Sequence, residues 1–206
     1  DAIEDYLPGI YKGQTVYLAG PSHAEEVARS KLTGLISASK NGKNAIRFRE
    51  LLANEQLIVF PSLDIRGVQI SAAMKNVIAI AFGIMDALAD ASEHIGDNTE
   101  SLLFAAGLNE IQTLGTAMGA SHPETFTSIA GVGDLDVTCR SRYGRNRRFG
   151  QEIVTKNILK DFSGIDDVIS RLDDIGYFPE GVVATRYVYR LAANFGLPLP
   201  VCQGVY

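Results

Sequence analysis

The stretch DIRGVQISAAMKNVIAIAFGIMDALAD, residues 64–90, predicts one long helix inside the protein. Lys75 is the only charged residue between Arg66 and Asp86, and apolar side chains surround nearly the whole helix. Such a helix is either the buried core of a domain or a membrane span. Lys75 and Asn76 interrupt the run near its middle, where a charge inside a membrane costs about 2.5 kcal/mol or more. We therefore expect a core helix and no membrane span.

The lysine in this helix is a candidate functional residue. A lysine in an apolar setting is paired with an acid, is poised with a lowered pKa, or extends along its methylene groups to the surface. Poised lysines are frequent proton donors and acceptors. Asn76 beside it adds a hydrogen-bond donor and an acceptor. Lys75 and Asn76 are therefore candidates for a site, with a surface lysine as the alternative.

Upstream of this helix, short apolar runs alternate with helical patterns. Residues 15–60 read as strand, helix, strand, helix and strand, in TVYLAG, SHAEEVARS, TGLISAS, NAIRFRELLAN and LIVFP. This alternation is typical of parallel strands joined by crossover helices, so we expect three parallel strands. Helical patterns then cover residues 64–90, 99–119, 123–130, 150–159, 164–175 and 180–195. The predicted fold class is α/β plus all-α, with domains at residues 1–66 and 67–206.

Composition narrows the class of partner. The 206 residues carry a net charge of -5, which argues against a surface built for nucleic acid. Two cysteines without a CxxC motif, and only three histidines, give neither a disulfide framework nor a metal-binding pattern, so we expect no metal and a cytoplasmic location. The opening residues DAIEDYLPGIYKGQ show no signal peptide, and both ends look cut, so we expect part of a longer protein.

The stretch AGPSHAEE, residues 19–26, joins the first strand to a helix. Ser22 and Glu25 have the spacing of a capping box, which satisfies amide groups at a helix start. A helix that begins at the carboxyl end of a strand lies where α/β sheets bind ligands. The alternative is a well-capped helix with no further role.

Five arginines gather within GVGDLDVTCRSRYGRNRRFG, residues 131–150. We expect a glycine-rich loop here, in which Asp134 either orients an ammonium or hydroxyl group or is an ordinary turn aspartate. Arginine suits bidentate phosphate binding, and Asn146 can add an amide donor. We expect one or two arginines to face a small anion and the others to pair with acidic residues.

Six segments, in this order, resemble the NAD(P)-dependent glycerol-3-phosphate dehydrogenases of bacteria: GPSHAEEVA, MKNVIAIAFGI, GLNEIQTLGTAMGA, ETFTSIAGVGDLDVTC, GRNRRFG and EGVVATRYVY. The resemblance covers nearly the whole chain. It implies the C-terminal half of a Rossmann-type sheet, followed by a helical domain like the C-terminal domain of 6-phosphogluconate dehydrogenase. It also implies a homodimeric enzyme that interconverts sn-glycerol 3-phosphate and dihydroxyacetone phosphate with NAD or NADP, for glycerophospholipid synthesis.

The resemblance also implies roles for single residues. Lys75 is the general acid/base, and Asp134 shares the catalytic site with it. The residues implied to bind substrate are Gly20, Ser22, Lys75, Asn76, Asp134, Thr138, Arg145 and Asn146. The residues implied to contact the dinucleotide are Ala24, Arg145, Phe178 and Glu180.

One departure keeps other functions open. No G-x-G-x-x-G occurs in the sequence, although the family carries this dinucleotide fingerprint in a unit that would precede Asp1. The alternatives are a non-catalytic module that binds phosphate or nucleotide, another hydroxyacid dehydrogenase of similar architecture, and a nucleic-acid-binding or interaction protein built around the arginines.

Overall fold

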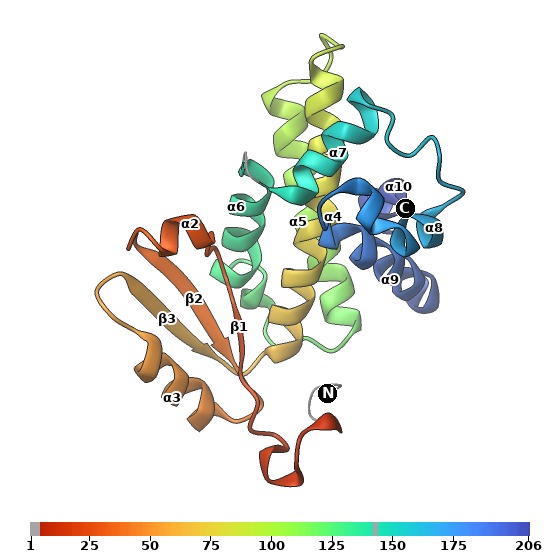
Figure 1. The fold of residues 1–206 in the computed structure, drawn as a ribbon. Coiled ribbons are helices and arrows are strands. Elements are labelled where there is room, and N and C mark those ends of the chain that lie inside the picture. The colour runs from red at the N-terminus through yellow and green to blue at the C-terminus, as the bar shows by residue number, and fades with distance from the viewer. Residues whose placement is uncertain (1–4, 142–143) are drawn as a thin grey trace.

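A computed structural model describes residues 5–141 and 144–206 and places a small sheet beside a bundle of helices (Figure 1). The sheet part contains β1 (Tyr17–Ala19), α2 (Ala24–Val27), β2 (Thr33–Ala38), α3 (Gly42–Leu52) and β3 (Leu57–Ser62). The helical part contains α4 (Ile65–Ala89), α5 (Asp97–Ala117), α6 (Asp134–Arg140), α7 (Arg145–Thr155), α8 (Ile165–Ser170), α9 (Glu180–Phe195) and α10 (Pro200–Val205). Short helical turns lie at Gly9–Tyr11, Pro123–Thr125, Ile129–Gly133 and Leu172–Ile175. The predicted order, an α/β segment followed by helices, is confirmed.

The sheet is mixed, so the prediction of three parallel strands is wrong. The strand order is β1-β2-β3; β2 and β3 run parallel, but β1 runs antiparallel to β2. A parallel pair needs a crossover, usually a helix, that returns the chain to the same end of the sheet. The eleven-residue α3 provides it between β2 and β3. The four-residue α2 is too short to do so, and the chain turns back along β1 instead.

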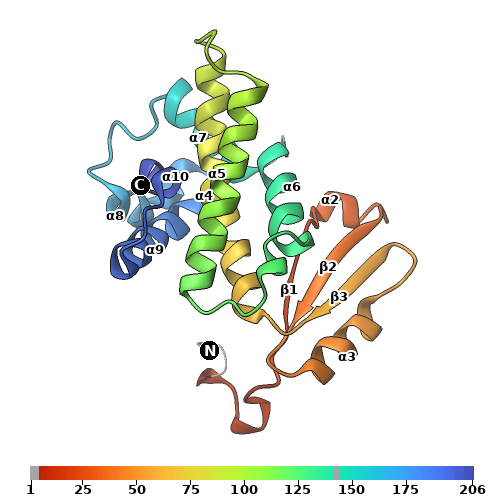
Figure 2. The ribbon, with the colours of Figure 1, turned by 180° about the vertical axis from the view of Figure 1, so that it is seen from behind.

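The predicted core helix is confirmed as α4, which lies at the centre of the helical part (Figures 1 and 2). It packs against α5, α6, α7 and α9. Its fully buried side chains include Met74, Ile78 and Phe82, and each such burial stabilises the fold by about 1.5–3 kcal/mol. By length and composition α4 could also cross a membrane, but half of its most apolar window is buried against the neighbouring helices. This burial is that of a core helix.

Two glycines bring α4 and α7 into close contact. A Cβ atom on Gly83 would lie 1.9 Å from the carbonyl oxygen of Arg147, and one on Gly150 would lie 2.1 Å from that of Ile80. Only hydrogen fits at these positions, so the backbones of the two helices touch. The crossing fixes the beginning of α7, which carries Arg145 and Asn146, relative to α4, which carries Lys75.

The predicted glycine-rich loop around residues 131–134 is helical. A five-residue π-helical turn, Ile129–Gly133, leads directly into α6, and Asp134 is the first residue of α6. A Cβ atom on Gly131 would lie 2.1 Å from the carbonyl oxygen of Phe126. This glycine therefore allows a tight turn to pack, and Asp134 is not a turn aspartate. α7 also begins earlier than predicted, at Arg145.

Asp64 ties the start of α4 to the segment that follows α5. Its carboxylate accepts hydrogen bonds from the backbone amides of Gly67 (3.0 Å) and Ser121 (3.1 Å) and from the hydroxyl of Thr125 (2.8 Å). Burial opposes ionisation of this carboxyl group, yet the hydrogen bonds outweigh burial and lower its pKa. Asp64 is the N-cap of α4 and, at the junction between β3 and α4, ties the start of that helix to residues 121–125.

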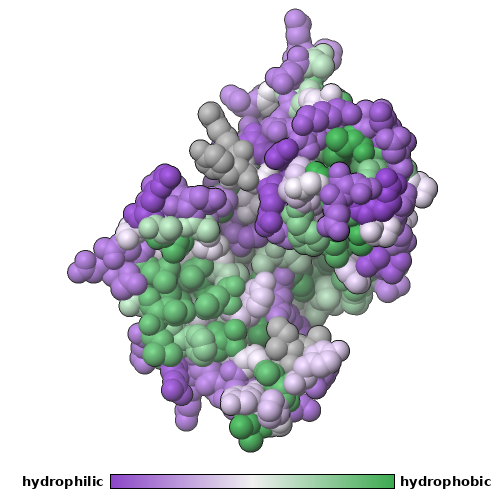
Figure 3. Space-filling model, viewed as in Figure 1, coloured by the Kyte–Doolittle hydropathy of each residue, from purple (hydrophilic) through white to green (hydrophobic). Residues whose placement is uncertain are grey.

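The two parts differ in the surface that they present. Figure 3 shows apolar surface gathered over the sheet, whereas the helical part is mostly polar from the same side. Exposed apolar side chains of the sheet part include Leu18, Leu32, Ile58 and Phe60. The sheet part therefore exposes apolar side chains to solvent, whereas the helical part presents mostly polar residues on this side.

Candidate functional site

Lys75 and Asp134 form the centre of the candidate site. Lys75 Nζ, on α4, donates a hydrogen bond to Oδ1 of Asp134, on α6, at 2.5 Å. The Asp134 side chain is 2% exposed, whereas that of Lys75 is 21% exposed. Of the alternatives left open for Lys75, pairing with an acid is the one observed. Because the Lys75 side chain stays partly exposed, a ligand can contact it while the buried Asp134 carboxylate keeps it in position.

The second oxygen of Asp134 has no partner. Oδ2 is buried and accepts no hydrogen bond from any residue that the structure describes. Such an oxygen costs about 1–3 kcal/mol unless a water or a ligand satisfies it. The Lys75–Asp134 pair therefore offers a ligand both a cation and an unused acceptor. Thr138, one turn further along α6, donates its hydroxyl to the backbone oxygen of Asp134 at 2.6 Å.

Tyr17 is a residue near the site that the sequence did not reveal. It lies on β1 and packs in a cluster with Ala72, one turn before Lys75. Burial raises the pKa of the Tyr17 phenol, and the negative charge of Asp134 raises it further. The phenol thus lies within the electrostatic reach of the Asp134 carboxylate. A tyrosine in a short strand carries no sequence signal for this placement.

A chain of hydrogen bonds links α4, α7 and α9 through two asparagines. Asn146 Nδ2 donates to Asn76 Oδ1 at 2.9 Å, and Asn146 Oδ1 accepts from the backbone amide of Gly181 at 2.8 Å. Asn76 in turn donates to the backbone oxygen of Ala72 at 3.2 Å. Asn146 is 5% exposed. The asparagine thus fixes three helices beside Lys75 and keeps one amide hydrogen for a ligand.

Arg145 and Glu180 form an ion pair at the first residues of α7 and α9. Both side chains are well exposed, at 55% and 39%. Phe178, two residues before Glu180, is also exposed, at 47%. Helix N-termini and a guanidinium group attract anions, and an exposed ring can stack on a planar group. The residues expected to contact a dinucleotide on the helical side therefore lie together.

The other described arginines pair with acids, as the sequence suggested. Arg140 bonds to Asp136, Arg147 to Asp86 and Arg148 to Glu152. Arg142 lies outside the described residues. Arg145 is also paired, so every arginine of this cluster that the structure describes has an acidic partner. The Arg145 pair is exposed and lies at the first residues of α7 and α9, so a ligand at these helix N-termini can reach it.

The loop after β1 carries the remaining predicted residues. The capping box is wrong: the N-cap of α2 is His23, which makes no side-chain cap, and the Ser22 hydroxyl donates to the Gly20 carbonyl at 3.0 Å. Gly20 has φ +134°, a conformation that favours glycine. Ala24 begins α2. No hydrogen bond or ion pair connects this loop to Lys75 within the described ranges.

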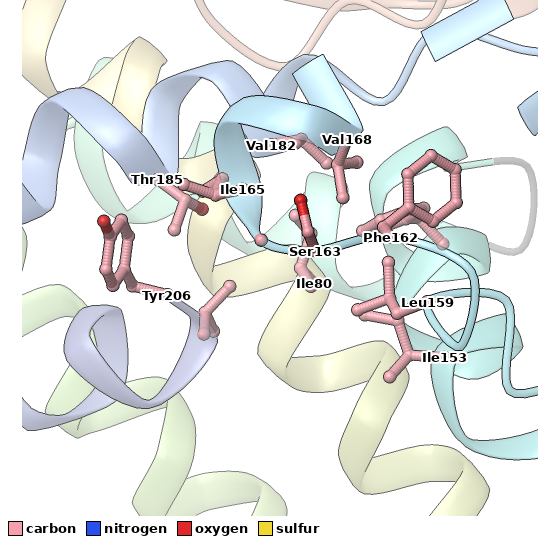
Figure 4. Close-up of a pocket in the computed structure, with 13 residues that line it drawn as sticks. Ile80, Ile153, Leu159, Phe162, Ser163, Ile165, Val168, Val182, Thr185 and Tyr206 are labelled. Atoms are coloured by element: carbon pink, nitrogen blue, oxygen red, sulfur yellow. The ribbon is translucent and has the colours of Figure 1, made fainter. Parts of the chain in front are cut away.

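The apolar cavity in Figure 4 lies apart from these residues. It encloses about 230 Å³ between α4, α7, α8, α9 and the end of α10, and none of the predicted site residues lines it. No group of three His, Cys, Asp or Glu side chains that could hold a metal occurs among residues 5–141 and 144–206.

Comparison with known proteins gives two family matches. The family described as "NAD-dependent glycerol-3-phosphate dehydrogenase C-terminus" matches residues 64–206, and the corresponding N-terminus family matches residues 1–45. The chain is 64% identical over 206 residues to a glycerol-3-phosphate dehydrogenase (NAD(P)+) of Treponema denticola and 62% identical to that of Treponema pallidum. It spans 58% of the length of each of these relatives.

Solved structures agree with the fold. The glycerol-3-phosphate dehydrogenase of Coxiella burnetii superposes with a TM-score of 0.77 at 33% identity, over 92% of this chain and 54% of that protein. The enzyme of Saccharomyces cerevisiae superposes with a TM-score of 0.72 at 24% identity, over 92% of this chain and 54% of that protein, which supports the fold alone.

Proposed function

This chain belongs to the NAD-dependent glycerol-3-phosphate dehydrogenase family, and we propose that it supplies the substrate-binding and acid/base part of an enzyme that interconverts sn-glycerol 3-phosphate and dihydroxyacetone phosphate. The observation that carries the proposal is the accessible Lys75 ammonium held by Asp134, whose second oxygen is free. This pair can protonate or polarise a ketone oxygen and accept a hydrogen bond from a neighbouring hydroxyl group.

In ketone reduction, Lys75 donates a proton to the developing alkoxide, and in alcohol oxidation the neutral amine takes it back. Asp134 Oδ1 accepts a hydrogen bond from the ammonium group, and Oδ2 accepts one from a hydroxyl group of the substrate. Asn146 and the N-terminus of α7 bind the substrate phosphate, aided by Arg145. When bound, the nicotinamide supplies hydride transfer.

The dinucleotide fits the chain only in part. Arg145 and Glu180 at two helix starts, the exposed ring of Phe178, and Ala24 at the start of α2 are the residues that would contact it. The glycine-rich turn that seats the pyrophosphate is not in the sequence. The chain on its own therefore binds NAD(P)H poorly, and a complete enzyme needs further sequence for the cofactor.

We further propose that the boundary between the domains lies at residues 66 and 67, and that the complete enzyme is a cytoplasmic homodimer whose glycerol 3-phosphate serves glycerophospholipid synthesis. The change from mixed sheet to helices at β3 and α4 supports the domain boundary. The similarity to the family supports the other statements.

A chimera tests the function directly. The aligned segment of the Treponema denticola relative is replaced by this chain, which restores the length that the 206 residues lack. We expect the chimera to oxidise NADH or NADPH in the presence of dihydroxyacetone phosphate, measured by nicotinamide absorbance. The 206-residue chain alone should show no turnover and only weak binding of small phosphate esters.

Two outcomes would contradict this. A folded chimera that turns over no dihydroxyacetone phosphate would remove the proposed reaction and favour a phosphate-binding role without catalysis. Steady oxidation by the 206-residue chain, in proportion to its amount, would show that these residues seat the cofactor by themselves.

A further inference from the structure

Glu152 is a buried carboxylate on α7 that the proposed reaction does not use. It is 8% exposed and accepts hydrogen bonds from Arg148 Nε (2.9 Å), Lys156 Nζ (2.8 Å) and the Tyr177 hydroxyl (2.6 Å). Burial disfavours its charge, but these three donors outweigh burial and lower the pKa of Glu152 to about 2. Glu152 therefore stays ionised near neutral pH and is a strong acceptor for the tyrosine.

Tyr177 is held on two sides. Its hydroxyl donates to Glu152 Oε2, and the Arg148 guanidinium lies 4.5 Å from the centre of its ring. Tyr177 directly precedes Phe178 and lies three residues before Glu180, in the irregular segment that leads into α9. Its contacts attach the beginning of this segment to α7.

The other end of the same segment is attached to the beginning of α7. Glu180 pairs with Arg145, and the Gly181 amide donates to Asn146. Along α7, Glu152 lies seven residues beyond Arg145, which is about 10 Å at the rise of a helix. The segment from Tyr177 to Glu180 is thus attached to α7 at both of its ends.

We propose that Glu152 and Tyr177 are positioning residues that hold the segment carrying Phe178 and Glu180 against α7, in the place where these two residues meet the nicotinamide cofactor. The inference rests on the proposed function, in which Phe178 and Glu180 contact the dinucleotide. Tyr177 and Glu152 themselves touch neither substrate nor cofactor. They act through the backbone between Tyr177 and Glu180, so their loss affects cofactor binding more than proton transfer at Lys75.

The test compares two tyrosines in the chimera. Tyr177→Phe removes the hydroxyl and keeps the ring beneath Arg148. Tyr187→Phe is the matched control, because the Tyr187 ring also lies beside an arginine guanidinium, that of Arg186 (5.0 Å), and its hydroxyl also has a charged hydrogen-bond partner, the Arg186 donor at 3.2 Å. Tyr187, however, is on the exposed side of α9. We expect Tyr177→Phe to raise KM for NADPH about tenfold, the effect of losing one hydrogen bond to a charged group, with kcat and KM for dihydroxyacetone phosphate within twofold. Tyr187→Phe should change none of these values.

Deuterium exchange of the peptide spanning residues 177–183 tests whether Tyr177 holds this segment against α7, an attachment that we call the clamp. This measurement does not depend on enzyme activity. Tyr177→Phe should speed exchange of the Gly181 amide about tenfold, and Tyr187→Phe should not. Unchanged exchange would overturn the clamp, whatever the kinetics. Faster exchange with an unchanged KM for NADPH, in an active chimera, would overturn its role toward the cofactor. An inactive parent chimera would contradict both the proposed function and this role toward the cofactor. The exchange result would still show whether Tyr177 holds the segment against α7.

Discussion

The helical part of the molecule and the sheet part bury their apolar residues to different extents. In the helical part, long side chains of α4, α5 and α6 interlock at almost zero exposure. In the sheet part, the small core of Ala19, Ile36 and Ala38 is completed by Val68 and Ala130 from the helical side. A hollow of about 530 Å³ lies between the last two strands and residues 122–129.

The difference divides the proposed site residues into two groups. Lys75, Asp134 and Asn146 are fixed mostly by contacts between helices, whereas Gly20 and Ser22 lie on the part that leaves apolar surface open. The helical part should therefore hold its geometry in this chain alone. The sheet part should depend on further sequence, because the whole chain spans only 58% of the relatives' length.

The largest expected effect comes from Lys75→Ala in the chimera. Removing proton transfer lowers kcat by about 100-fold to 10,000-fold, with the fold intact by circular dichroism. The matched control is Lys31→Ala in the sheet part, which removes another lysine–carboxylate pair, an exposed one with Glu26 at 2.7 Å, and should leave kcat unchanged. Near-normal turnover of Lys75→Ala would place the chemistry outside the helical part.

A smaller effect is expected at the joint between the two parts. Asp64→Ala leaves two backbone amides and the Thr125 hydroxyl without their acceptor and should lower the free energy of unfolding by about 3 kcal/mol, measured by urea denaturation. Asp90→Ala, at the exposed opposite end of α4, should change stability by less than about 0.5 kcal/mol. Equal effects of the two substitutions would mean that the carboxylate at the joint does not organise the start of α4.

The sequence predicted some of these features and not others, for physical reasons. The all-round apolar pattern of residues 64–90 predicts a helix, and Lys75 and Asn76 near its middle favour a buried core helix over a membrane span, so α4 was predictable almost to its ends. The direction of β1 depends on how the chain leaves α2, and a four-residue helix gives no periodic signal. Lys75 and Asp134 lie 59 positions apart in the sequence. Only the family resemblance therefore predicted that they share one site. Glu152 and Tyr177 matched no motif, and their contact depends on how α7 packs beside α9.

The smallest effect concerns pH. Glu152 has a pKa of about 2 in the folded chain against an ordinary value of 4.5, so its contribution to stability is complete above pH 4.5 and is lost as the pH falls toward 2. Two of its partners are largely exposed, so we expect about 1 kcal/mol. The stability difference between the parent and Glu152→Gln, from urea midpoints, should shrink between pH 5 and pH 2.5. A difference that does not change with pH would show that the charge of Glu152 is not what stabilises this contact.

The most direct test is whether the 206-residue chain recognises the substrate phosphate through its helical part. Glycerol 3-phosphate is titrated into the 206-residue chain, followed by amide chemical shifts, with glycerol as the ligand control. We predict weak, saturable shifts at Asp134 and the first turn of α7 that glycerol does not produce, that Asn146→Ala abolishes in a folded chain, and that Asn194→Ala on the exposed side of α9 retains. Binding that survives Asn146→Ala, or shifts confined to the sheet, would contradict a substrate site built by the helices around Lys75.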